Sequence, residues 1–404
     1  MKIFPGFFYI SHKGTEEFMI TRLKVGNYRS LADIDIRPGP LMVLVGANGS
    51  GKSNLIDVLR FVRDIMVRGL NRAVLDRHGI DEIRCRSSAD ENVRIHLRLD
   101  LPDCSGEYGF TLGRTDAGGC RVTWEKCVAK KGSVINAFEI RDGKWVTCPE
   151  CFSPDHLRPL SDTELTLPAA AHTDSDGIRH ICEYLGKMGF YAIHPENMRP
   201  PQKLGNPYPL DEDGRNIASV LRDLGKKPAE IANLLDALRV VVPDVENCTV
   251  EMIGGYLVTR LHHTPVNGET PAFDLAHESE GTLRILGILT AFYQTPPIPL
   301  LAVEEPELNI HPGVIGILRD LLFEMARGMQ VIVTTHSPDL IADLPADIVM
   351  IVEKDHGVTK IGAISGVQRR AVTEKLFWPG ELMRMEGLRR ESALAGRGLQ
   401  PRPK

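Results

Sequence analysis

The octapeptide GANGSGKS at residues 46–53 constrains the fold of this chain more than any other feature of its sequence. It fits the pattern G-x-x-x-x-G-K-[ST], in which glycines let backbone N–H groups curl around phosphate oxygens. The apolar run LMVLV precedes it and SNLIDVLRFV follows it, so the sequence predicts a buried strand, a phosphate-binding turn and a helix. This context disfavours the alternative of a glycine turn that only introduces a helix.

The motif therefore predicts a nucleotide site with Lys52 at the β and γ phosphates and Ser53 as a ligand of Mg²⁺. The other nucleotide contacts expected from this segment are Gly46, Asn48, Gly49, Ser50, Gly51 and Asn54.

Composition excludes several classes of protein. The 48 Lys and Arg residues face 53 Asp and Glu residues, a net charge of −5, so any contact with nucleic acid needs a local basic patch. No apolar run approaches the roughly 20 residues of a membrane span. Residues 1–18 lack the features of a signal peptide, and the 8 cysteines are irregularly spaced. We expect a cytoplasmic protein without a membrane partner, in which residues 1–18 are an extension.

Two carboxylates end the apolar segment PLLAVEEPE at residues 299–307. A buried strand that ends in adjacent acids can place one carboxylate near Mg²⁺ and the next near an attacking water. We therefore expect Glu304 to orient the metal shell and Glu305 to act as general base. By itself such a strand fits a solvated charged end, but a P-loop upstream favours catalysis.

Two weaker signals accompany these motifs. The apolar strand VIVTT at residues 331–335 runs into His336, which alone fits a hydrogen-bonded polar residue at a strand end. Upstream, HESEGTLRIL places Ser279 at the N-cap of a helix and Gly281 in its first turn, where free amides can receive an anion.

In this order the motifs resemble the ABC-type ATPase heads of the RecF, SMC and OLD-like group, especially the stand-alone RecF-like ATPases of the AAA_21 type, over residues 19–365. The resemblance implies that GANGSGKS is Walker A, SEGTLR the signature motif, AVEEPE Walker B and TTHSP the switch-histidine segment. It implies catalytic roles for Lys52, Glu305 and His336, and it places Asn309 and His311 in or beside the D-loop.

Two further segments are similar to the family. NYRSL at residues 27–31 resembles its N-terminal segment, which implies that Arg29 and Ser30 touch the nucleotide. FYAIHPENMRPPQKL lies where the Q-loop is expected, and Gln202, its only glutamine, is a candidate Mg²⁺ ligand; a proline-rich connector is an equal alternative.

The chain also departs from related families. Glu280 and Glu304 stand where transporter ATPases usually have glycine and aspartate, which argues against a transporter subunit. No coiled-coil arm splits the sequence, which excludes a true SMC protein. The 68 residues after His336 are too few for the fused Toprim nuclease of OLD proteins, so we expect any nuclease to be a separate subunit.

The expected fold class is α/β, a P-loop NTPase of ABC-ATPase type with a mixed-sheet core, an antiparallel β subdomain and a helical lobe. The expected divisions after the extension are lobe I with the P-loop and a β meander at 19–160, a helical signature lobe II at 161–290, the Walker B and switch-histidine part of lobe I at 291–365, and a basic tail at 366–404.

The resemblance implies an ATPase that uses ATP and Mg²⁺ and forms an ATP-sandwiched head-to-tail homodimer. Such a dimer controls DNA or a partner effector, such as a separate nuclease, in DNA repair or anti-phage genome defence. One alternative is a nucleotide switch that does not hydrolyse ATP and regulates a partner protein; the other, less favoured, is an ABC transporter ATPase subunit.

Three weaker patterns remain. Cys148 and Cys151 have metal-ligand spacing and could bind zinc with Cys120 and Cys127, although ordinary strand and turn cysteines explain them better. Basic runs at 59–86 and 369–404 could follow a phosphate backbone or be solvated surface. The segment around Trp378 could dock on a partner or on its own ATPase core.

Overall fold

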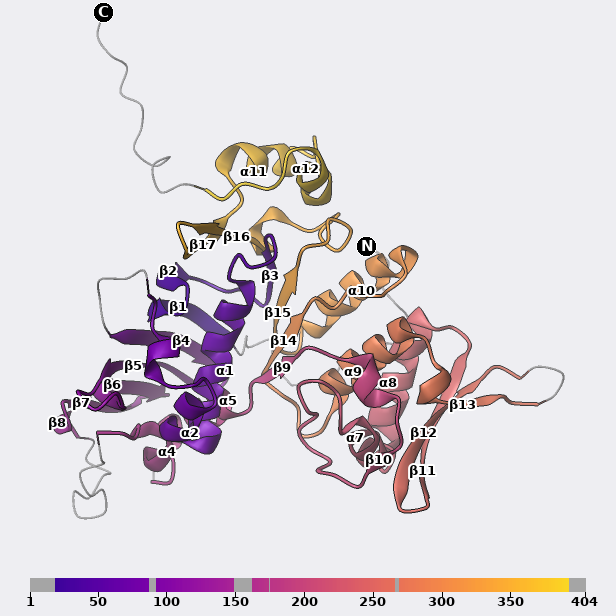
Figure 1. Cartoon of the computed structure of the whole chain (residues 1–404), viewed down its shortest axis with the longest axis horizontal. Coiled ribbons are helices and arrows are strands. Elements are labelled where there is room, and N and C mark those ends of the chain that lie inside the picture. Colours follow the sequence, from indigo (N-terminus) through magenta and orange to yellow (C-terminus); the bar gives the residue numbers. More distant parts are fainter. Residues whose placement is uncertain (1–18, 87–91, 149–161, 174, 266–268, 392–404) are drawn as a thin grey trace, which may run out of the picture.

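The strand and the helix predicted on either side of GANGSGKS are both present. In the computed structural model, which describes residues 19–86, 92–148, 162–173, 175–265 and 269–391, β3 (Leu41–Val45) leads into the loop and α1 (Lys52–Arg68) leaves it (Figure 1). Every residue of β3 is buried. The extension at residues 1–18 lies outside the described residues.

A six-stranded sheet runs through the middle of the molecule, and its inner strands are parallel. β3 lies between β16 (Val349–Asp355) and β15 (Gln330–Thr335), and β14 (Leu300–Glu304) lies between β15 and β9 (Gly189–Tyr191). The antiparallel β17 (Val358–Ala363) closes the β16 edge. Because parallel strands end at the same edge, the loops that follow β3, β14 and β15 leave the sheet side by side.

Both faces of this sheet are buried, and the alternation of side chains divides them between two cores. Met42 and Leu44 of β3 face the first core, whereas Leu41, Val43 and Val45 face the second. Burial on both faces explains why the strands are continuous apolar runs in the sequence.

The first core lies between α1 and an antiparallel seven-stranded sheet. Its strand order is β2 (Leu31–Ile36), β1 (Met19–Tyr28), β4 (Val93–Leu101), β5 (Cys104–Arg114), β6 (Cys120–Lys131), β7 (Val134–Arg141) and β8 (Lys144–Thr147). The expected meander is therefore present. The short helices α2 (Leu70–Leu75), α3 (Ile80–Ile83) and α4 (Leu167–Ala170) and the longer α5 (Asp176–Gly186) complete this half.

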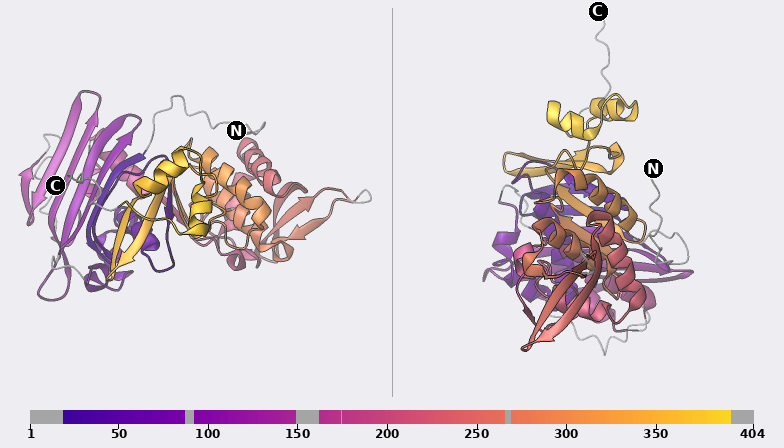
Figure 2. Two further views of the ribbon diagram at one scale, coloured as in Figure 1. Left: turned by 90° about the horizontal axis from the view of Figure 1, so that it is seen from above. Right: turned by 90° about the vertical axis from the view of Figure 1, so that its right-hand side faces the viewer.

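The second core supports the helical lobe. Its helices are α6 (Pro195–Met198), α7 (Ile217–Leu224), α8 (Pro228–Val241), α9 (Glu280–Tyr293) and α10 (Pro312–Met325). A small sheet of β10 (Gln202–Lys203), β12 (Tyr256–His263), β11 (Val245–Ile253) and β13 (Ala272–Asp274) covers it, followed by the 3₁₀ turn η1 (Leu275–His277). The β11–β12 hairpin and the seven-stranded sheet lie at opposite ends of the molecule (Figure 2).

The structure differs from the expected divisions in two places. Leu167, Ile178 and Ile181, expected in lobe II from residue 161 on, belong to the first core because α4 and α5 pack beside α1 and the antiparallel sheet. The expected tail includes α11 (Gly366–Thr373) and α12 (Pro379–Met385), which follow the 3₁₀ turn η2 (Ala346–Ile348) and β17. A Cβ at Gly380 would lie 2.4 Å from the carbonyl oxygen of Pro338, so α12 docks closely on the segment after His336.

No helix among the described residues has the length and apolar character to span a membrane.

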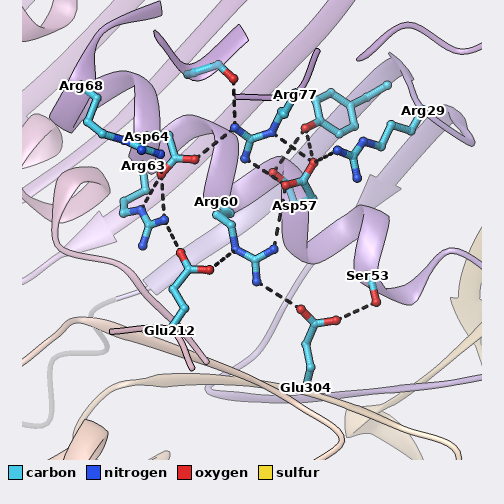
Figure 3. A network of polar contacts seen from close by, with 12 residues as sticks. Arg29, Ser53, Asp57, Arg60, Arg63, Asp64, Arg68, Arg77, Glu212 and Glu304 are labelled. Carbon is cyan, nitrogen blue, oxygen red and sulfur yellow. Dashed lines mark hydrogen bonds and ion pairs between the residues drawn. The ribbon is translucent and has the colours of Figure 1, made fainter. Parts of the chain in front are cut away.

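Buried ion pairs hold α1 against the segment that follows it (Figure 3). Arg77, 7% exposed, donates to both carboxylate oxygens of Asp57 at 2.9 and 3.2 Å and to Asp64 at 3.0 Å. Tyr28 donates its hydroxyl to Asp57 at 2.6 Å. Burial opposes ionisation of Asp57, but the hydrogen bond and charge of Arg77 outweigh it and lower the pKa of Asp57. Asp57 and Asp64 are therefore buried carboxylates that depend on Arg77.

We predict that Arg77→Ala destabilises the protein. Removing one partner of a buried ion pair costs about 3–5 kcal/mol, and the lower end applies because Arg29 and Arg63 still contact the two carboxylates. The measurement is the midpoint of urea unfolding followed by tryptophan fluorescence. The control is Arg72→Ala, because Arg72 is 64% exposed and pairs with Asp76 at the surface; its cost should stay under about 1 kcal/mol. Equal shifts for the two variants would contradict the assignment.

Candidate nucleotide site

The P-loop places the ammonium of Lys52 over its own backbone. Lys52 Nζ donates to the carbonyl oxygens of Gly46 at 2.7 Å and Ala47 at 3.1 Å. Burial lowers the pKa of Lys52, and the nearby carboxylates Glu305, Glu307 and Glu304 oppose this effect. The ammonium can exchange its carbonyl partners for phosphate oxygens without leaving the loop.

Two positions of the loop must be glycine because residues of β16 and β17 lie too close to leave room for a Cβ atom. A Cβ at Gly46 would lie 2.2 Å from the carbonyl oxygen of Val352 in β16. A Cβ at Gly51, where φ is +109°, would lie 2.0 Å from the hydroxyl of Thr359 in β17. The loop therefore gains its shape from residues about 300 positions downstream as well as from its own motif.

Thr359 is the centre of a polar clasp that the sequence did not reveal. Its hydroxyl donates to the carbonyl oxygen of Ser50 at 2.7 Å and lies 2.6 Å from the hydroxyl of Ser30. Asn54 of α1 donates its amide to Ser30 at 2.6 Å. Ser30, Ser50 and Asn54 are thus joined through one threonine, which fixes the loop to α1.

Arg29 lies beside Ser30 but points to α1. Its guanidinium contacts Asp57 at 3.0 Å, and its backbone has a left-handed φ of +49° (Figure 3). The contact of Arg29 and Ser30 with a nucleotide stays a prediction.

The oxygen atoms suited to Mg²⁺ meet between α1 and β14. The hydroxyl of Ser53 donates to a carboxylate oxygen of Glu304 at 2.6 Å. Hydroxyl and carboxylate oxygens are the donor types that Mg²⁺ accepts, with water and phosphate completing its shell. The residues present therefore fit the ion, and Ser53 and Glu304 would hold it.

Arg60 contacts the carboxylate oxygen of Glu304 that Ser53 does not contact. The sequence did not predict this role of Arg60. Its guanidinium lies 3.1 Å from Glu304 and 3.1 Å from Glu212, a residue of the helical lobe (Figure 3). Arg63, one turn further along α1, also contacts Glu212, at 2.5 Å. Arg60 thus neutralises the metal-side carboxylate and ties it to the helical lobe. The separation of 7 residues from Ser53, two helical turns, is the sequence signal that could have suggested it.

The Gln202 amide is not part of this arrangement. Its oxygen accepts from the backbone N–H of Ala218 at 2.9 Å, and its nitrogen donates to the carbonyl oxygen of Asn197 at 3.3 Å. The side chain is buried within the helical lobe, so the expectation that Gln202 ligates Mg²⁺ is not met in this structure.

Glu305 and His336 face each other where β14 and β15 end. A carboxylate oxygen of Glu305 lies 3.2 Å from Nδ1 of His336. Glu305 adopts a left-handed φ of +44°, and its N–H donates to the carbonyl oxygen of Thr334 at 2.9 Å. This strained turn directs the carboxylate away from the strand and toward the histidine.

A buried carboxylate lies behind this pair. Glu307 is 7% exposed, and Thr335 donates its hydroxyl to it. Burial raises the pKa of Glu307, against the effects of Thr335 and His336. Arg284 of α9 is also 7% exposed, and burial lowers its pKa. The negative charges of Glu280, Glu307 and Glu305 act in the opposite direction. Glu307 and Arg284 were not predicted.

Ser279 caps α9 as expected. Its hydroxyl accepts from the N–H of Thr282 at 3.1 Å. A Cβ at Gly281 would lie 3.2 Å from the carbonyl oxygen of Asn309, whose side chain bonds Glu280. Among the described residues, no hydrogen bond joins Ser279 to residues 46–54.

His311 has a structural contact of its own. It caps α10, with Nδ1 accepting from the N–H of Gly313 at 3.1 Å. Asn309 and His311 thus border the signature helix and the start of α10.

The zinc hypothesis gains no support. Cys120 and Cys127 are buried in β6, and burial raises the pKa of Cys120 to about 12, which disfavours the thiolate that zinc needs. Cys148 is exposed, and Cys151 lies outside the described residues. In the described part of the chain, no three His, Cys, Asp or Glu side chains are grouped for a metal ion.

Several arginines of the basic run at 59–86 form ion pairs inside the molecule. Arg60, Arg63 and Arg77 have side chains 20, 19 and 6% exposed, and each contacts carboxylates. These three arginines are therefore not free to follow a phosphate backbone, whereas Arg68, Arg72 and Arg86 are exposed.

Comparisons with known proteins identify the family of this chain. The chain matches the family model AAA_21, described as "AAA domain, putative AbiEii toxin, Type IV TA system", over residues 41–119 and 200–342, together more than half of its length. It is 38% identical over 123 residues to the DNA replication and repair protein RecF of Brucella abortus, covering 30% of each chain. It is 24% identical over 356 residues to the OLD nuclease of Thermus scotoductus, covering 83% of this chain and 62% of the nuclease. The matched stretches are thus under two thirds of both relatives.

A solved structure shows the same fold. The SMC head bound to the C-winged helix domain of ScpA has a TM-score of 0.53 at 13% identity and covers 87% of this chain and 99% of that chain. The predicted fold class, an α/β P-loop NTPase of ABC-ATPase type, is confirmed.

We predict that Thr359→Val weakens ATP binding about tenfold, because Ser50 loses its donor and an unsatisfied buried acceptor costs about 1–3 kcal/mol. The measurement is displacement of a fluorescent ATP analogue. Thr373→Val is the matched control, since its hydroxyl donates to Arg369 on the exposed side of α11. Unchanged ATP affinity in Thr359→Val would show that the clasp does not shape the loop.

Proposed function

This chain belongs to the AAA_21 family and is an ATPase of the RecF, SMC and OLD type, and from that premise we propose that ATP joins two copies of it head to tail. Each nucleotide would lie between residues 46–54 of one copy and Ser279 of the other. Closure and hydrolysis would control DNA or a partner effector, such as a nuclease subunit, in cytoplasmic DNA repair or anti-phage defence.

The observation that carries the proposal is the meeting of Lys52, Ser53, Glu304, Glu305 and His336 at the ends of β3, β14 and β15. Bound Mg²⁺ supplies charge neutralisation at the β and γ phosphates. Lys52 binds the same phosphates. Glu305 orients the attacking water and accepts its proton, and His336 holds the Glu305 carboxylate in place. A general base with its own orienting partner favours hydrolysis over a switch that does not turn over ATP.

One observation and one symmetry argument favour a shared site. Ser279 and the N-terminus of α9 form an anion-binding end that makes no hydrogen bond to the P-loop of the described chain. Two copies that exchange these ends would form an isologous dimer, the commonest oligomer symmetry. The γ-phosphate would complete the interface, and its loss would open it.

The names of the relatives support the proposed setting. RecF is a DNA replication and repair protein, and the OLD protein is a nuclease. A role of this chain in controlling DNA or a nuclease rests on that similarity and on the ATP site.

We predict that Glu305→Gln lowers ATP turnover about 100-fold or more and traps an ATP-bound dimer, because it removes the general base while leaving the shape of the side chain. Light scattering with ATP and Mg²⁺ measures the assembly. Lys52→Ala is the control, and it should stay monomeric. A Glu305→Gln protein that remains monomeric at saturating ATP would refute the proposed dimer.

We also predict that duplex DNA raises steady-state ATP turnover, and that turnover per chain rises with protein concentration. Lys52→Ala provides the background rate. Turnover that depends on protein concentration but not on DNA would overturn the DNA half of the proposal and favour a protein effector.

A further inference from the structure

A buried histidine lies between two carboxylates directly beside the signature serine. His263, at the end of β12, has Nδ1 2.9 Å from a carboxylate oxygen of Asp244 and Nε2 2.8 Å from one of Glu278. His263 and Glu278 are each 9% exposed, whereas Asp244 is at the surface. The ring of Phe273 packs edge to face on the imidazole, with centroids 5.3 Å apart.

Both ring nitrogens lie within hydrogen-bond distance of a carboxylate oxygen. A neutral imidazole carries one N–H, so it can satisfy one carboxylate while its second nitrogen directs a lone pair at the other. An imidazolium donates to both carboxylates at once. The two distances fit a protonated His263 that carries one positive charge between two negative ones, and the raised pKa of His263 agrees with this state.

Glu278 connects this cluster to the nucleotide-binding end of α9. It immediately precedes Ser279, the N-cap of the helix. The same turn is held from its backbone by Arg199, which donates to the carbonyl oxygens of Ala276 and Glu278 at 2.9 Å each. Arg199 thus fixes the main chain and His263 fixes the side chain of the residue before Ser279.

We propose that protonated His263 is a positioning residue for the ATP-bound dimer, an inference that rests on the proposed function. It neutralises Glu278 and so fixes the turn that presents Ser279 and the N-terminus of α9 to the triphosphate of the partner copy. Without the proton, a neutral imidazole donates to only one of the two carboxylates, and the Glu278 carboxylate loses the positive charge that neutralises it next to the place where a highly charged anion must dock.

The dependence on pH follows from the charges that face the ring. Burial lowers the pKa of His263, but its hydrogen bonds to Glu278 and Asp244 and their charges outweigh burial, so its pKa lies above the ordinary 6.5. Phe273, the other group packed on the ring, carries no charge. The bridge is complete below the ordinary pKa and is lost as pH rises through the raised pKa. Dimerisation should therefore weaken toward alkaline pH.

The first test is a pH titration of the nucleotide-free protein by NMR, which does not require a dimer. We expect the His263 ring signals to titrate above the ordinary value and the amide signals of Ser279 and Gly281 to move with the same midpoint. Glu278→Gln should return the His263 pKa toward its ordinary range, because it removes the charge of the more buried carboxylate. A His263 that titrates at or below its ordinary pKa would overturn the proposal.

The second test measures ATP-dependent dimerisation of Glu305→Gln from about pH 6 to pH 9, with and without His263→Gln. The protein that keeps His263 should dimerise about tenfold more weakly at the alkaline end, the effect of losing one hydrogen bond to a charged group. His263→Gln should dimerise weakly throughout and lose this dependence. His262→Gln is the matched control, because the neighbouring imidazole bonds only Thr249 among the described residues.

Comparison with Glu278→Gln separates a positioning role from a structural one. This variant removes the Glu278 charge, so dimerisation should become independent of pH and match the strength seen at low pH. If the His263→Gln variant shows the same pH dependence as the protein that keeps His263, the positioning role is refuted. If Glu305→Gln fails to dimerise at any pH, the proposed dimer fails, and the NMR titration still decides whether His263 controls the Ser279 turn.

Discussion

The register of the parallel strands is the constraint on which the site depends. Thr334 pairs with Glu304 and Thr335 with Val45, so the chain leaves β15, β14 and β3 at one level of the sheet. Glu305 and His336 directly follow β14 and β15, and Lys52 follows the end of β3 by seven residues. A slip of one residue would turn each strand's side chains to the opposite core, so burial on both faces fixes the register and thereby the site.

Charge balance around α1 is the second requirement. The helix that begins at Lys52 carries Asp57 and Asp64 on its buried side, and arginines compensate them. Arg60 extends this network to Glu304 and Glu212, so the carboxylate at the metal position is linked to the helical lobe (Figure 3). We expect nucleotide binding at Ser53 and Glu304 to alter these Arg60 contacts and so to reach the helical lobe. The contact of His263 with Glu278 gives the turn before Ser279 a comparable electrostatic support.

The sequence predicted what is local and strongly patterned. The strand, loop and helix around Lys52 follow from glycine spacing and apolar runs, and the acidic end of β14 follows from the adjacent Glu304 and Glu305. Thr359 could not be found this way, because a threonine in a short strand carries no pattern that names a distant partner. The spacing of Arg60 from Ser53 places it on the same face of α1 but does not name Glu304 or Glu212 as its partners. No sequence pattern names Asp244 and Glu278 as the partners of His263 either. Helices α4 and α5 were expected in the helical lobe but pack on the first core, because helical periodicity shows which face is apolar but not which core receives it.

The shared ATP site is the central claim, and mixing two inactive variants tests it most directly. Lys52→Ala lacks one half of the site and Ser279→Arg the other, so each homodimer has no complete site. A mixed dimer has one complete site, and an equal mixture should recover up to about a quarter of the wild-type ATP turnover if copies pair at random. Turnover well above the sum of the two variants alone is the result predicted here. Full activity of Ser279→Arg by itself, or a mixture no more active than that sum, would contradict the account.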